Sequence, residues 1–265
     1  MLRGRMKPSK AFLTIAAAVT ACVAFTGATI RSHAASPAVA VTPRFAAVAF
    51  DYFVLFNPGS VASAAERMFP GHGQALTDIW RTRQFEYGWL RTLEGRYTDF
   101  GRVTEDALAY AASATRIQLT DSQRTQLLDA YRNLAPWPET IEALARLRAA
   151  HVRAIALSNF SPSMLEANAR HAHLTGLLEA LISTDASHTY KPDPRAYQLG
   201  ADYLRLDKSQ IVFAAFGGWD AAGARAFGYP TVWVNRLDSP VEHLDGLPDR
   251  TVRDLNALVE FVVGR

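Results

Sequence analysis

The chain has 265 residues, of which 49% are hydrophobic and 20% charged, so it can bury a sizeable core and is not a disordered chain. Its formal net charge of +3 comes from the N-terminus, because residues 1–34 hold five of the 28 basic residues and no acid. The remainder has 23 basic and 25 acidic residues, which gives no support for nucleic-acid binding.

Residues 1–34 have the pattern of a secretory signal peptide. A basic start precedes a largely apolar stretch over 11–30, and the small residues Ser32 and Ala34 suit cleavage by signal peptidase after Ala34. We expect export to a bacterial periplasm, with residues 35–44 as a linker and no membrane association after cleavage. An uncleaved anchor is the alternative, since the apolar stretch approaches membrane-spanning length.

Cys22 is the only cysteine of the chain. It ends a loose lipoprotein-like box, although the apolar run continues past it. The mature protein would therefore have no disulfide, no cysteine nucleophile and no thiolate metal site.

The first predicted core strand covers residues 45–51 and ends at Asp51. Residues 58–135 show no strong strand signal and contain three helical patterns, at 75–94, 104–115 and 121–134. We interpret this stretch as a helical block inserted after the first strand.

Strands and helices alternate through the rest of the chain, which is typical of a parallel sheet. The predicted strands are 152–157, 180–183, 211–215 and 230–234. The predicted helices are 138–149, 162–172, 194–205, 220–226 and 252–263. The fold class predicted from this order is α/β, a Rossmann-like parallel sheet core in 45–57 and 136–265 with an inserted helical cap domain in 58–135.

Polar residues follow several of the predicted strands, at Asp51, Ser158-Asn159 and Asp220, and Lys191 stands between two elements in Tyr190-Lys191-Pro192-Asp193. The carboxyl ends of parallel strands meet at one edge, where open α/β sheets bind ligands. An aspartate beside a lysine stays ionised and can act as a nucleophile. Each residue also has a structural explanation: Asp51 and Asp220 as helix caps, Ser158-Asn159 as a turn, and Lys191 as a solvated loop residue.

The chain resembles the L-2-haloacid dehalogenases, the type II enzymes of the haloacid dehalogenase superfamily, over residues 45–263. The motifs that carry the likeness are Phe69-Pro70-Gly71, Trp80-Arg81, Gln84-Phe85-Glu86-Tyr87, Trp89-Leu90-Arg91, Arg96-Tyr97, Leu157-Ser158-Asn159, Tyr190-Lys191-Pro192-Asp193 and Trp219-Asp220-Ala221. The resemblance implies hydrolysis of a short (S)-2-haloacid to the inverted 2-hydroxy acid and halide through an aspartyl ester, without a metal or cofactor.

The same resemblance implies a role for each matching residue. Asp51 is the nucleophile, and Arg81 with Asn159 receives the departing halide. Ser158 holds the substrate carboxylate, Lys191 keeps Asp51 charged, and Asp220 positions the hydrolytic water. The residues expected around the substrate are Tyr52, Phe85, Phe100, Tyr197 and Trp219.

Some positions depart from the family pattern, and two other functions stay open. Ala215 and Gly217 stand where the family has Ser and Asn, and the Gly-Thr pair that commonly follows the nucleophile is missing. An exported binding protein without turnover is therefore one alternative. The other is a Mg²⁺-dependent phosphatase of the same superfamily, which is disfavoured because Phe53 occupies the position of its second aspartate. A homodimer is also an open expectation.

Overall fold

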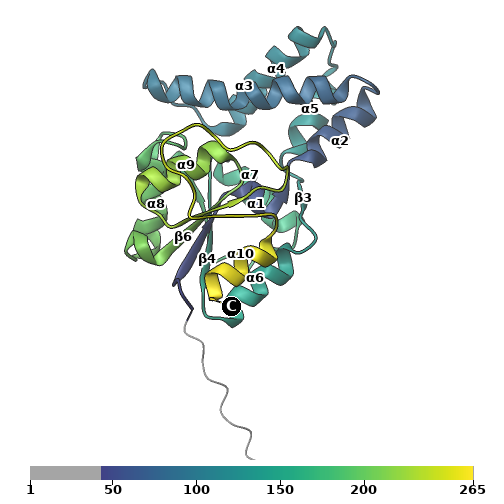
Figure 1. The fold of residues 1–265 in the computed structure, drawn as a ribbon. Coiled ribbons are helices and arrows are strands. Elements are labelled where there is room, and N and C mark those ends of the chain that lie inside the picture. Colours follow the sequence, from purple (N-terminus) through teal and green to yellow (C-terminus); the bar gives the residue numbers. More distant parts are fainter. Residues whose placement is uncertain (1–42, 265) are drawn as a thin grey trace, which may run out of the picture. The chain divides into compact units, whose positions relative to one another are not determined.

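The computed structural model describes residues 43–264, which lie within one compact unit that begins at Val41 (Figure 1). The predicted signal peptide and all but the last two residues of the predicted linker lie outside the described residues. No helix within 43–264 combines the length and apolar character needed to cross a membrane.

The core of this unit is a six-stranded parallel sheet in the order β5-β4-β1-β6-β7-β8, which confirms the predicted fold class. The first strand, β1, lies between β4 and β6, and its Ala49 pairs with Ile155 on one side and Phe213 on the other. The strands are β1 Ala47–Phe50, β4 Arg153–Ser158, β5 Ala180–Ser183, β6 Ile211–Ala215, β7 Thr231–Val234 and β8 Arg250–Val252.

Both faces of the sheet are covered by helices. In β1, Val48 and Phe50 pack into one apolar cluster and Ala47 and Ala49 into another, as the period of two in a strand requires. The first cluster takes residues from α6 (Thr140–Ala149), α7 (Pro162–His171) and α10 (Leu255–Val263). The second takes residues from α8 (Pro194–Leu204) and α9 (Gly218–Phe227). Because β1 lies between β4 and β6, the residue that follows it, Asp51, stands near the middle of the sheet edge.

Four helices form a cap over this edge, with α3 and α4 at the top of the view in Figure 1. They are α2 Gly59–Met68, α3 Gly73–Leu93, α4 Phe100–Thr115 and α5 Asp121–Ala130. The chain enters and leaves the cap through a short antiparallel pair, in which β2 (Phe56–Asn57) pairs with β3 (Ala135–Pro136). A short helix, α1 (Tyr52–Leu55), joins β1 to β2, and the 3₁₀ helices η1 (Thr184–Ser187) and η2 (Lys208–Gln210) lie in core connections.

Several elements differ from the prediction, which did not include α1, α2 or the pair of β2 and β3. The last cap helix ends at Ala130 instead of 134, because the side chain of Asn168 accepts a hydrogen bond from the Leu134 amide and donates one to the Tyr131 carbonyl. These bonds replace the next helical turn. The strand β8 was not predicted, since two of its three residues are exposed and its sequence shows no apolar run.

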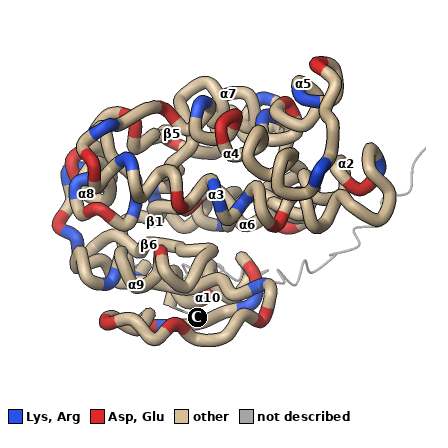
Figure 2. Tube along the Cα trace, turned by 90° about the horizontal axis from the view of Figure 1, so that it is seen from above, with Lys and Arg blue, Asp and Glu red and all other residues tan. Residues whose placement is uncertain are grey.

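Basic and acidic residues are interspersed along the described part of the chain in the view of Figure 2.

Candidate active site

The carboxyl ends of β1, β4 and β6 bring the predicted polar residues to one edge of the sheet, beneath the cap. Asp51 follows β1 directly, and its amide donates to the Ala214 carbonyl of β6 at 2.8 Å. Ser158 ends β4, and Asp220 lies in the first turn of α9 after β6. Lys191 comes from the loop before α8.

The Lys191 ammonium joins two carboxylates. Its Nζ donates to Asp51 Oδ1 at 2.7 Å and to Asp220 Oδ2 at 2.8 Å. The side chains of Lys191 and Asp220 are each 1% exposed, whereas that of Asp51 is 14% exposed. Asp51 is therefore the carboxylate of this cluster that another molecule can reach.

The second oxygen of Asp51, Oδ2, accepts from the Phe53 amide at 3.2 Å, so this residue caps α1 as well as pairing with Lys191. Asp220 is not the cap of α9, because that helix begins at Gly218 with Gly217 in the capping position. The alternative that both residues serve as helix caps is therefore correct in part for Asp51, which caps α1 and also pairs with Lys191, and wrong for Asp220.

Burial and neighbouring charges shift the pKa values of Asp220, Lys191 and Tyr197. Burial raises the pKa of Asp220 to about 6, although the Lys191 ammonium opposes this effect. Burial would lower the pKa of Lys191, but the charges of Asp220 and Asp51 outweigh it and raise that pKa. Burial and the Asp220 charge raise the pKa of Tyr197 well above its usual value, so its hydroxyl stays protonated and donates to Asp220 Oδ1 at 2.7 Å.

Asn159 and Ser158 are fixed by their own hydrogen bonds. Asn159 Oδ1 accepts from the Lys191 amide at 2.9 Å and from Thr184 Oγ1 at 3.3 Å. Because the oxygen is engaged, the amide nitrogen of Asn159 is the atom left to donate to a ligand. Ser158 Oγ accepts from the Phe160 amide at 3.1 Å, which leaves its proton free to donate.

A small cavity of about 30 Å³, here called the catalytic cavity, lies between Asp51 and the cap. Its walls are mostly aromatic, and Asp51, Asp220 and Arg81 supply its charges. The lining residues are Asp51, Phe53, Arg81, Phe85, Phe100, Ser158, Asn159, Phe160, Phe216, Gly217, Trp219 and Asp220. Space of this size holds one or two waters and little more, so a substrate must displace side chains to enter.

Arg81 reaches the catalytic cavity from α3. Its Cζ lies 4.9 Å from the centre of the Phe53 ring and 5.7 Å from those of Phe85 and Phe216. Burial lowers the pKa of this guanidinium, and acidic groups including Asp51 oppose the shift. Among the described residues Arg81 makes no ion pair within 4.0 Å, so its charge is available to an anion.

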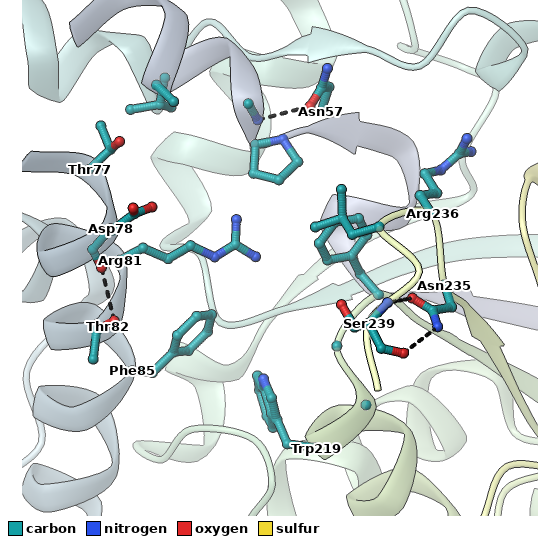
Figure 3. A pocket seen from close by; sticks show the side chains of 18 of the residues that line it. Asn57, Thr77, Asp78, Arg81, Thr82, Phe85, Trp219, Asn235, Arg236 and Ser239 are labelled. Atoms are coloured by element: carbon teal, nitrogen blue, oxygen red, sulfur yellow. Dashed lines mark hydrogen bonds between the residues drawn. The ribbon is translucent and has the colours of Figure 1, made fainter. Parts of the chain in front are cut away.

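Arg81 also lines a larger space of about 580 Å³ between α3 and the core, here called the outer cleft. Figure 3 shows its side chain extending from α3 into this cleft, with Phe85 one turn further along and Trp219 beyond it. The outer cleft is therefore the open space next to the catalytic cavity.

The structure brings most of the predicted site residues together but not all. Tyr52 is fully buried away from the catalytic cavity, where its hydroxyl donates to the Leu165 carbonyl at 2.8 Å. Tyr197 reaches the site only through Asp220. Sequence reasoning did not include Phe53, Phe160 and Phe216 in the wall, although the last two stand directly after Asn159 and Ala215 at strand ends.

Within 43–264, no group of three or more His, Cys, Asp or Glu side chains could hold a metal ion.

Comparison with known proteins shows similarity to haloacid dehalogenases at the level of both the family model and individual relatives. The model of the haloacid dehalogenase-like hydrolases matches residues 29–228. An (S)-2-haloacid dehalogenase of Pseudomonas sp. (strain YL) is 41% identical over 215 residues, which cover 81% of this chain and 93% of that protein. Haloacetate dehalogenase H-2 of Moraxella sp. (strain B) is 36% identical over 217 residues, 82% of this chain and 97% of that protein.

A solved structure is also similar to this chain in both fold and sequence. The L-2-haloacid dehalogenase from Xanthobacter autotrophicus with chloropropionic acid covalently bound superposes with a TM-score of 0.77 and 35% identity, over 83% of this chain and 99% of that one. The chain therefore belongs to the family of haloacid dehalogenase-like hydrolases.

Proposed function

We propose that this protein is a hydrolytic dehalogenase, which converts a short (S)-2-haloacid to the 2-hydroxy acid of inverted configuration and halide. The observation that carries the proposal is the Asp51 carboxylate, paired with the buried Lys191 and facing an aromatic cavity that also holds Arg81. The names of the relatives, and the chloropropionic acid bound covalently in the Xanthobacter structure, support the same chemistry.

In the first step an oxygen of Asp51 attacks C2 of the substrate opposite the halogen. A C–O bond forms, the carbon–halogen bond breaks, and the halide leaves with the bonding electrons, so C2 inverts. Lys191 pairs with the Asp51 carboxylate and holds it in place, and the aromatic walls limit the hydration of this carboxylate, which would otherwise weaken it as a nucleophile. Ser158 is the donor that we assign to the substrate carboxylate.

The departing halide needs positive charge or N–H donors where its own charge develops. Arg81 supplies a guanidinium without a carboxylate partner among the described residues, and Asn159 supplies an amide nitrogen. Both residues line the catalytic cavity together with Asp51.

In the second step water attacks the acyl carbon of the Asp51 ester. The bond between that carbon and the former Asp51 oxygen now attached to C2 breaks. That oxygen takes up a proton and leaves as the hydroxyl group of the product, and Asp51 regains its carboxylate with one oxygen from water. We assign Asp220 to orienting the water and accepting its proton, because it shares the Lys191 ammonium with Asp51 and is held by Tyr197.

The phosphatase alternative is disfavoured by the same geometry. Phe53 occupies the position of the acid that would protonate a leaving alkoxide, and its ring packs against Phe160 at 5.4 Å and against Arg81. A phenyl ring supplies neither a proton nor a metal ligand.

Halide release is the direct test. The purified protein should release chloride from (S)-2-chloropropionate and from monochloroacetate, and Asp51→Asn should abolish the release. Folded wild-type protein that releases no halide from any short haloacid would contradict the proposal. Trapped ester on Asp51 without turnover would favour the binding-protein alternative, for which Ala215 and Gly217 are the basis.

We also propose that the protein acts in the periplasm after cleavage of residues 1–34. The basic start, the apolar stretch and the small residues Ser32 and Ala34 support this. Expression of the full chain in a Gram-negative host should give a periplasmic protein whose N-terminus is Ala35. An intact N-terminus in the membrane fraction would favour the uncleaved anchor.

A further inference from the structure

Trp219, in the first turn of α9, borders four spaces, one of which, of about 380 Å³, lies along α9. It lines the catalytic cavity beside Asp51, and it lines the outer cleft on the side of Arg81. It also lines an apolar space of about 430 Å³ on the surface, here called the side groove. The indole is therefore a wall between the catalytic cavity and the side groove.

This wall is held by two aromatic contacts from α3. The Trp219 ring lies edge-on to Phe85 at 5.4 Å and to Trp89 at 5.3 Å between centroids. Phe85 stacks on Trp89 at 5.8 Å, and Trp89 Nε1 donates to the Lys191 carbonyl at 3.0 Å. The indole thus packs in an aromatic cluster that is hydrogen-bonded to the loop carrying Lys191.

Gly217 leaves the space that this position requires. A Cβ added at residue 217 would lie 2.8 Å from Trp219 Nε1 and 3.1 Å from its Cδ1, closer than side-chain contacts allow. The backbone of Gly217 has φ −89° and ψ 142°, which any residue adopts. The absence of a side chain at Gly217 therefore leaves the space in which the indole lies, and the backbone conformation does not itself require glycine.

The side groove has the chemistry of an alkyl-binding surface. Leu93 and Leu244 line it and are 83% and 52% exposed, and the other walls are the rings and stems of Trp89, Thr92, Tyr190 and Pro192. Asp193 also lines the groove and is the one ionisable side chain besides the Tyr190 phenol to do so. An aliphatic chain that entered here would cover apolar surface that is now exposed to water.

We propose that Trp219, seated against Gly217, determines chain-length specificity by closing the catalytic cavity off from the side groove. The inference rests on the proposed dehalogenase function. The wild-type protein accepts 2-haloacids whose alkyl group ends at the indole. Removal of the indole joins the two spaces and admits the tail of a longer 2-haloacid into the groove.

The test compares kcat/KM for (S)-2-chloropropionate and (S)-2-chlorohexanoate, measured as chloride release. In Trp219→Ala the ratio of long-chain to short-chain kcat/KM should rise at least tenfold over wild type. Leu93→Ser, added to Trp219→Ala, should lower the long-chain value and leave the short-chain value unchanged. Leu247→Ser, at an exposed leucine that lines neither space, is the matched control and should change neither value.

Gly217→Ala provides a second, independent variant. It should change the chain-length ratio at least threefold in the wild-type background by displacing the indole, and by less than that in the Trp219→Ala background, where no indole is displaced. If Trp219→Ala does not fold, Trp219→Leu takes its place in the comparison.

An unchanged or lower ratio in Trp219→Ala, or equal effects of Gly217→Ala in both backgrounds, would overturn the inference. Absence of halide release from both acids by the wild-type protein would instead contradict the proposed function.

Discussion

Replacement of Lys191 by methionine tests the charge cluster most sharply. The substitution keeps the length of the side chain but leaves Asp51 and Asp220 without their shared ammonium, and both Lys191 and Asp220 are 1% exposed. Loss of one partner from a buried ion pair costs about 3–5 kcal/mol, because a charge stays buried without compensation. We therefore expect the free energy of unfolding at pH 8 to fall by about 3–5 kcal/mol.

This loss should depend on pH in a defined direction. The pKa of Asp220 is about 6 in the folded protein against 3.8 as its ordinary value, so the folded state binds the proton more readily than the unfolded state. Its contribution favours folding below about pH 4 and is lost as the pH rises through about 6. Without the ammonium this carboxyl takes up its proton at still higher pH, so the loss should be small at pH 5 and large at pH 8.

Urea unfolding of both proteins at pH 5 and pH 8 gives the measurement. The double variant Lys191→Met/Asp220→Asn is the control, because it removes one of the two uncompensated charges and should regain part of the stability at pH 8. A loss that is equal at both pH values, with no recovery in the double variant, would refute the reasoning. Turnover of Lys191→Met should be undetectable or nearly so, since Asp51 then lacks the ammonium that holds and pairs with its carboxylate.

Three further outcomes follow from the site and the cap. The value of kcat should fall at acid pH as Asp220 takes up a proton. The pKa of Asp220 is about 6 in the free protein, and ester formation removes the Asp51 charge that helps to raise it, so the fall should lie below pH 6. A profile that stays flat down to about pH 4 would exclude Asp220 as the base. Arg81→Met should lower kcat about 10²–10³-fold in steady-state halide release, as does removal of a single donor to a developing charge, while Arg81→Lys keeps part of the rate. Asn168→Ala leaves the Leu134 amide and the Tyr131 carbonyl unpaired, so urea unfolding should show a loss of about 1–3 kcal/mol with kcat unchanged. A change in kcat without a change in stability would contradict the structural role of Asn168.

The strands could be predicted because each is marked by a local sequence pattern. The charge cluster could be predicted in part because its carboxylates follow strands that end at the same edge of the sheet. The strands β1 and β6 are short runs of buried apolar residues, and β4 is mostly so. Polar residues stand at or just after the ends of these three strands, where the sheet topology brings them together. The role of Lys191 could not be predicted from its local sequence, because its pairing with Asp51 joins residues 140 positions apart in the chain. Its neighbouring prolines alone did not distinguish it from a solvated loop lysine.

Other features depend on tertiary contacts that sequence patterns do not encode. Arg81 was singled out only by resemblance, since nothing in its helical context distinguishes it from a surface arginine. The burial of Tyr52 against Leu165 depends on how α1 packs on α7, so its predicted place beside the substrate had no geometric basis. The contact between Gly217 and Trp219 likewise becomes visible only when the indole is placed in three dimensions.

The central claim, that Asp51 itself attacks carbon, is tested most directly by one turnover in ¹⁸O-labelled water with enzyme in excess over (S)-2-chloropropionate. We expect the first 2-hydroxy acid released to carry no label in its hydroxyl group, while the peptide containing Asp51 gains ¹⁸O in that carboxylate. Label in the hydroxyl group of the product, with none in Asp51, would show direct attack by water on C2 and would contradict attack by Asp51.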